Sequence, residues 1–90
     1  MEIRINKGFL KDLADLPAKD RKRIARFVFD DIKKYASPHE IPNFGKLTGY
    51  DNFYKIRFGN YRAGVKFENN TIYFKRLLHR KDIYKFYPGK

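Results

Sequence analysis

Apolar and polar residues follow two different periods along this chain, one typical of strands and the other typical of helices. Met1–Ile5 alternates apolar with charged side chains, which predicts a strand. Apolar residues then recur at helical spacing, which predicts a short helix over Lys7–Leu16 that Asn6 can cap. A second helix is predicted from Pro17, whose missing N–H is harmless in a first turn, to about Tyr35. The apolar helix positions are Phe9, Leu10, Leu13 and Leu16, then Ile24, Phe27, Val28, Ile32 and Tyr35.

The second half of the chain returns to the alternating period. After a loop over residues 37–52, strands are predicted at Asn52–Phe58, Tyr61–Glu68 and Thr71–Leu78. Gly59-Asn60 and Asn69-Asn70 separate them, and both pairs tolerate the positive φ of two-residue hairpin loops. We therefore predict one α+β domain over residues 1–90. An N-terminal strand and a helical hairpin pack on a three- to four-stranded, mainly antiparallel sheet, followed by a short C-terminal helix or tail over His79–Lys90.

The first two strands of this sheet separate into an apolar face and a basic face. The loop at Gly59-Asn60 pairs Arg57 with Arg62 and Lys55 with Gly64. Like charges directly across a strand pair destabilise a sheet by up to ~1 kcal/mol. A phosphate between the two guanidinium groups would neutralise both, and Gly64 would leave open floor for it beside Lys55. The alternative is a solvated face, because a one-residue slip would separate the two arginines.

The third strand fits this register less well. Pairing through Asn69-Asn70 sets Phe74 opposite Val65, as a shared core requires. The same register places Arg76 on the apolar face, near Ala63. Either a bulge redirects Arg76 or the strand ends near it, and the sequence leaves both open.

Charge adds a first indication of a partner. The chain carries a net charge of +11, and residues 52–90 hold ten basic and only two acidic side chains. This excess predicts a polyanionic partner for the C-terminal half, although it is also typical of a soluble basic protein without a specific ligand. Cysteine is absent, which excludes disulfides and thiolate metal sites, and no apolar run approaches the ~18 residues of a membrane span. We expect a cytoplasmic location.

The tail adds candidate functional residues. Arg80 and Tyr84 are expected near the end of the sheet, on one side of a helical turn. His79 is the titrating group nearest to them and a candidate acid, although a lone histidine is more typical of a surface or capping residue. Four further lysines are predicted to contact the polyanionic partner: Lys66, Lys75, Lys81 and Lys85.

Three segments together resemble the RelE/ParE toxin superfamily of bacterial type II toxin–antitoxin systems. They are Lys46-Leu47-Thr48-Gly49, the run from Phe53 to Arg62, and His79-Arg80-Lys81-Asp82-Ile83-Tyr84. The order of strand, helical hairpin, Leu-x-Gly loop, meander and basic tail agrees over nearly the whole chain. The resemblance implies a RelE-like fold. It also implies the activity of RelE-like members, which cleave mRNA on the ribosome and so inhibit translation.

The resemblance carries catalytic roles to Lys55, Arg57, Arg62, Arg80 and Tyr84. Fewer residues separate Arg80 from Tyr84 in the sequence than separate the matching arginine and tyrosine of RelE, so Tyr87 is a possible substitute for Tyr84. The implied reaction is attack of a ribose 2′-OH on the adjacent phosphate, which leaves a 2′,3′-cyclic phosphate and a free 5′-OH.

Roles follow from the residue types. Lys55 is the candidate base, since the neighbouring arginines should favour its neutral amine. Arg62 with Arg57 would hold the phosphate, Arg80 would protonate or stabilise the leaving group, and Tyr84 would stack on a base. We expect neither a metal nor another cofactor, because metal-dependent nucleases gather carboxylates.

Superfamily membership also implies a cognate antitoxin. An acidic or amphipathic helix of that partner would dock on an apolar groove or displace the tail. Two other functions remain open. One is a ParE-like inhibitor of DNA gyrase, which shares the fold without nuclease activity. The other is a non-catalytic RNA-binding module, whose binding would weaken with salt.

Overall fold

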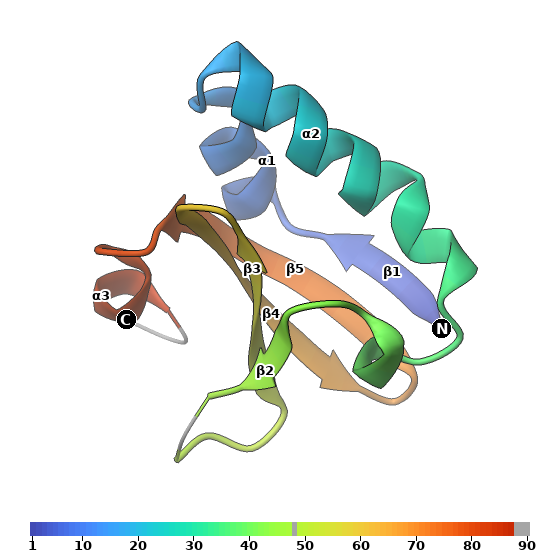
Figure 1. The fold of residues 1–90 in the computed structure, drawn as a ribbon. Helices are drawn as coiled ribbons and strands as arrows, with labels where there is room; N and C mark the ends of the chain where they lie inside the picture. Colours follow the sequence, from blue (N-terminus) through green and yellow to red (C-terminus); the bar gives the residue numbers. More distant parts are fainter. Residues whose placement is uncertain (48, 88–90) are drawn as a thin grey trace.

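The computed structural model describes residues 1–47 and 49–87, and it confirms the α+β class (Figure 1). One sheet has the strand order β1-β5-β4-β3-β2, in which β1 runs parallel to β5 and the other neighbours are antiparallel. The strands are β1 (Glu2–Ile5), β2 (Phe44–Lys46), β3 (Phe53–Phe58), β4 (Tyr61–Glu68) and β5 (Thr71–His79). The sheet thus has five strands rather than three to four. The strand β2 lies inside the predicted loop and is too short to show an alternating pattern.

Helices α1 (Lys7–Ala14) and α2 (Ala18–Phe29) cover one face of this sheet (Figure 1). The helix α2 ends earlier than predicted, and a 3-10 helix, η1 (Asp31–Lys34), follows it. Two consecutive aspartates, at positions 30 and 31, would stand at the negative end of the helix dipole, which disfavours continuation of α2. The 3-10 turn nevertheless keeps Ile32 fully buried.

Two predictions about α1 are wrong in detail. Leu10 is 44% exposed, because Phe9 and Leu13 lie on the side of the helix that faces the sheet. Asn6 occupies the N-cap position, but its side chain makes no capping hydrogen bond. Its backbone N–H instead donates to the carbonyl of Phe74, which joins the end of β1 to β5.

The remaining helical segments are η2 (Pro38–Glu40) and α3 (Ile83–Phe86). No helix in the described part of the chain is long and apolar enough to cross a membrane. Residue 48, in the predicted Leu-x-Gly loop, and residues 88–90, in the predicted tail, lie outside the described ranges.

The predicted pairing of β3 with β4 is confirmed at every position. Arg57 lies opposite Arg62 and Lys55 opposite Gly64, because Gly59 adopts the positive φ of a tight hairpin turn. Between β4 and β5 the register shifts at Gly64/Val65. A β-bulge at Lys75 therefore settles the ambiguity of the third strand, since Arg76 now pairs with Gly64.

Two apolar clusters hold the sheet. The main core lies between the sheet and the helices α1 and α2, where Phe9 packs edge-on against Phe74 with ring centroids 5.2 Å apart. We call the opposite side of the sheet the outer face. It carries a second, smaller cluster formed by Leu47, Ile83 and Tyr87 with Phe53 and Leu78. This small cluster attaches α3 to the outer face, beside the basic side chains of β3 and β4.

Candidate functional site

Three of the predicted site residues meet around one hollow on the outer face. Lys55, Arg57 and Arg62 line an open depression of about 330 Å³ together with Asn43, and we call it the basic depression. The strand register brings the three cations together, since they lie on the same face of neighbouring strands. Among the residues that the structure describes, no carboxylate lines it. The arrangement is suited to an anion small enough to contact several cations at once.

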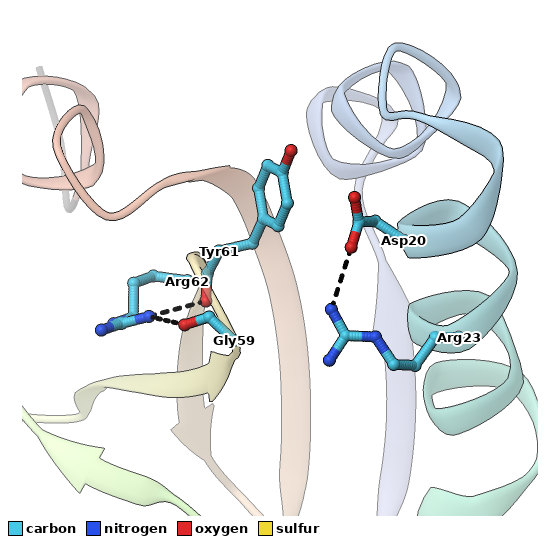
Figure 2. Close-up of polar contacts among 5 residues, drawn as sticks. All are labelled: Asp20, Arg23, Gly59, Tyr61 and Arg62. Atoms are coloured by element: carbon cyan, nitrogen blue, oxygen red, sulfur yellow. Dashed lines mark hydrogen bonds and ion pairs between the residues drawn. The ribbon is translucent and has the colours of Figure 1, made fainter.

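Neutral oxygens hold the two arginines in place. Arg57 Nη2 donates to the side-chain oxygen of Asn43 at 3.2 Å. Arg62 Nη1 donates to the carbonyl oxygens of Gly59 at 2.7 Å and Tyr61 at 3.0 Å (Figure 2). These contacts orient each guanidinium without cancelling its charge. Because a guanidinium has five N–H donors, both arginines keep donors free for a phosphate.

Lys55 is connected to the tail through Tyr84. Its Nζ donates to the Tyr84 hydroxyl at 2.5 Å, and the same nitrogen lies 5.3 Å from the ring centroid. The Tyr84 side chain is 57% exposed, whereas Tyr87 is buried. Of the two tail tyrosines weighed from the sequence, Tyr84 is therefore the one that contacts a residue of the basic depression, Lys55.

The predicted open floor at Gly64 is wrong. A Cβ at this position would lie 2.6–2.8 Å from ring atoms of Tyr87, so that ring fills the space above Gly64. The Tyr87 hydroxyl donates to the carbonyl oxygen of Val65, at the bulge of β4 and β5. Burial raises the pKa of Tyr87 above its ordinary value, so the hydroxyl stays a donor. Tyr87 thus helps to fasten α3, which carries Tyr84, to the sheet.

The other tail candidates lie at the end of the sheet. The Arg80 backbone N–H donates to the carbonyl of Asn60, beside the turn that joins Arg57 to Arg62, and its side chain is exposed. His79 pairs with Tyr61, and their rings meet edge-on with centroids 5.8 Å apart. Tyr61 packs against the main core, so His79 lies on the opposite side of the sheet from the basic depression. The structure does not bring His79 to the other candidates.

The four predicted RNA-binding lysines are dispersed around the basic depression rather than within it. Lys66 pairs with Glu68 at 2.6 Å, and Lys85 lies 3.7 Å from Asp82. These carboxylates are the only two in residues 52–90. Lys75 lies over the ring of Tyr73, and Lys81 is exposed beside His79.

A different arginine of the same half is neutralised by a carboxylate. At the bulge of β5, Arg76 Nε and Nη2 donate to the carboxylate of Asp12 at 2.7 and 3.2 Å. The backbone N–H of Leu77 donates to the same carboxylate at 2.9 Å. The hydrogen bonds with Asp12 raise the pKa of Arg76 above its ordinary value. This ion pair ties α1 to the edge of β5.

Sequence reasoning missed two residues that border the site. Asn43 adopts φ +63°, a left-handed conformation that asparagine accepts more readily than most residues. Arg23 of α2 places its guanidinium over the turn at Gly59 (Figure 2). Neither has a spacing that links it to β3. Only the turn-forming tendency of Asn43, within a loop rich in Pro and Gly, could have drawn attention to it.

The described residues contain no group of three His, Asp or Glu side chains arranged to hold a metal ion. What the site offers is positive charge, one lysine amine and one exposed aromatic ring.

Known proteins resemble this chain over nearly its full length. Residues 3–84 match the family described as the ParE toxin of the type II toxin–antitoxin system parDE. Toxin RelE3 of Methanocaldococcus jannaschii is 39% identical over 89 residues, which cover 98% of this chain and all of the relative.

Solved structures agree. The RelB–RelE antitoxin–toxin complex of Methanococcus jannaschii contains a chain with a TM-score of 0.78 and 39% identity, covering 94% of this chain and 99% of that one. The archaeal RelE–RelB complex of Pyrococcus horikoshii gives a TM-score of 0.67 at 26% identity, covering 91% of this chain and 97% of that one.

Proposed function

This chain belongs to the RelE/ParE superfamily of toxins from type II toxin–antitoxin systems, and we propose that it inhibits translation by cleaving mRNA on the ribosome. The observation that supports this proposal best is the basic depression. Lys55, Arg57 and Arg62 surround it, no carboxylate of the described part of the chain lines it, and Tyr84 is hydrogen-bonded to the lysine. A phosphodiester of RNA supplies the negative charge that these cations lack.

The proposed reaction uses the RNA's own 2′-hydroxyl. A bond forms between the 2′-oxygen and phosphorus while the bond from phosphorus to the 5′-oxygen breaks. Lys55 accepts the proton of the 2′-hydroxyl as the general base. Arg57 and Arg62 hold the non-bridging oxygens, whose negative charge grows in the transition state. The products are a 2′,3′-cyclic phosphate and a free 5′-hydroxyl.

The tail completes this arrangement in the proposal. The exposed ring of Tyr84 stacks on a base next to the cleaved bond, as aromatic side chains do on single-stranded RNA. Arg80, beside the turn at Asn60, stabilises the negative charge of the leaving 5′-oxygen, which takes its proton from solvent water. His79 has no part in this mechanism, because its ring packs on Tyr61 across the sheet.

The proposed protein partner is a cognate antitoxin. Two of the similar solved structures are complexes of a RelE chain with RelB. An antitoxin would silence this toxin if it moved α3, because Tyr84 reaches Lys55 from that helix. The small cluster under α3 and the packing of Arg76 over the Phe86 ring attach that helix to the sheet.

Primer extension on a translated message tests the nuclease proposal. Induction of the wild-type chain should produce new 5′ ends within the translated region, and Lys55→Ala should lose them. Removal of a general base slows a reaction by roughly 10²–10⁴-fold. Lys19→Ala removes an exposed lysine from α2 and serves as the matched control. Intact messages in wild-type cells, or unchanged cleavage by Lys55→Ala, would contradict the proposal.

Gyrase inhibition is the second candidate, because the matched family is described as the ParE toxins. It predicts a DNA-damage response on induction, with messages intact. The same cultures therefore distinguish the two functions: message ends report the nuclease, and a damage-responsive promoter reports gyrase poisoning.

A further inference from the structure

A second hollow adjoins the basic depression on the side of α2. It has a volume of about 320 Å³ and lies between the second half of α2 with η1 and the end of β3. Arg57 and Asn43 line both hollows, so their 3.2 Å hydrogen bond forms the ridge between them. We call it the helix-side depression. An RNA strand that crosses this ridge from the basic depression enters the helix-side depression directly.

Positive charge continues across the ridge between the two hollows. The guanidinium nitrogens of Arg23 lie 3.4 and 3.6 Å from the position that a Cβ on Gly59 would occupy. On the other side of this turn, Arg62 donates to the Gly59 carbonyl (Figure 2). The turn is therefore held between two guanidinium groups. Arg23 pairs with Asp20 through one nitrogen at 3.2 Å, which leaves further donors for a phosphate.

The walls of the helix-side depression differ from those of the basic depression in two ways. Tyr35 contributes a half-buried ring, tilted against Phe27 at 6.4 Å between centroids, and Lys34 lies over that ring. Asp31 contributes a carboxylate. An aromatic face and a hydrogen-bond acceptor beside three cationic side chains are groups that bind a nucleotide, rather than a phosphate alone.

We propose that the helix-side depression binds a nucleotide that flanks the cleaved bond. Arg23 contacts its phosphate, Tyr35 packs against its base, and Asp31 accepts a hydrogen bond from an exocyclic amine of that base. Guanine, adenine and cytosine carry such an amine and uracil does not, so this position selects against uridine. The inference rests on the proposed nuclease function and assigns it a determinant of sequence preference.

The test measures cleavage rates by the purified chain in a reconstituted translation reaction. The messages differ in one nucleotide at a time on either side of a chosen cut. Asp31→Ala should abolish the discrimination against uridine at one flanking position and leave the other positions unchanged. Arg23→Ala should slow cleavage of all messages about 5- to 10-fold, as loss of a sequence-independent phosphate contact does. Asp30→Ala and Lys22→Ala, both exposed neighbours, are the matched controls.

Each outcome decides the proposal. Asp31→Ala and Arg23→Ala variants that cleave every message like their controls would overturn it while the nuclease function stands. Variants that cleave normally but escape inhibition by the antitoxin would also overturn this proposal and leave the nuclease function standing, because the hollow would then bind protein. If the wild-type chain leaves all messages intact, the proposed function fails, and this inference fails with it.

Discussion

Two arginines on neighbouring strands, Arg62 and Arg76, show how the same side chain serves different ends in this molecule. Arg76 binds a carboxylate of α1 and so joins two elements of the fold. Arg62 binds only carbonyl oxygens and faces another arginine across the strand pair. The first arrangement satisfies the charge within the protein, and the second leaves it available.

The same contrast extends to the rest of the C-terminal half. Its two carboxylates lie beside Lys66 and Lys85, and the N-terminal half supplies Asp12 to Arg76. None is placed at the basic depression. A sheet that concentrates unpaired cations at one point accepts mutual repulsion there, which a bound phosphate would relieve. We infer that the distribution of carboxylates, more than the net charge, marks the functional surface.

Among substitutions that compare these two arginine settings, Arg62→Thr should have the largest effect. Loss of a preorganised donor to the reacting phosphate should slow cleavage by about 10²–10³-fold. The free energy of unfolding should stay the same or rise by up to ~1 kcal/mol, because a like-charge pair is removed from the sheet. Cleavage in a translation extract and urea unfolding measure the two quantities. A variant that loses activity only because it is unfolded would contradict the division of roles.

Asp12→Ala should give the opposite result. It leaves the Arg76 guanidinium and the Leu77 N–H without their acceptor in a half-buried setting, at a cost of about 3 kcal/mol in unfolding free energy. Cleavage below the lowered melting temperature should equal that of the wild type. Asp15→Ala, at the exposed end of the same helix, controls for loss of an acidic residue. An active-site role for Asp12 would appear as slow cleavage by a fully folded variant.

Gly64→Ala tests whether the packing of α3 on the sheet affects the basic depression. The added methyl group would overlap the ring of Tyr87, so α3 must shift. We expect a loss of about 2 kcal/mol in stability, as for other overpacked sites, together with slower cleavage because Tyr84 moves away from Lys55. Thermal melting and the cleavage rate report these changes. Normal activity would mean that the position of α3 is unimportant for the reaction.

Tyr87→Phe should have the smallest effect, about 1 kcal/mol, from loss of the hydrogen bond to Val65. The folded state raises the pKa of Tyr87, so the folded protein holds this proton at a pH where the unfolded chain releases it. The resulting stabilisation is complete below about pH 10 and declines as the pH rises further. Urea unfolding between pH 8 and pH 11 should therefore show a steeper decline for the wild type than for Tyr87→Phe. Equal slopes would contradict the burial of this hydroxyl.

Local signals in the sequence were sufficient for the fold class and for the central site. Turn residues at Gly59-Asn60 fix the hairpin register, and that register alone brings Lys55, Arg57 and Arg62 together. The sequence could not reveal what lies above Gly64, because Tyr87 arrives there through a tertiary contact of the tail.

Other features depend on contacts between distant segments. The β-bulge at Lys75 places Arg76 next to Asp12, which is 64 residues away in sequence, and no periodic pattern encodes such a pair. Asn43 borders both hollows from an irregular loop, where spacing carries no information about neighbours. The site was thus predictable where it depends on strand alternation, and it was not where it depends on the path of loops and tail.

A matched pair of substitutions tests the central claim most directly. Arg57→Ala removes an arginine of the basic depression, and Arg76→Ala removes one at the edge of β5. The measured quantity is the rate at which 2′,3′-cyclic phosphate ends form on a translated message, at a temperature where both variants are folded. We predict that Arg57→Ala slows this rate at least about 30-fold without lowering the melting temperature, while Arg76→Ala melts earlier and cleaves like the wild type. Equal rates for the two variants would contradict the claim that the reacting phosphate is held by the cations of the basic depression, which have no carboxylate partner among the described residues.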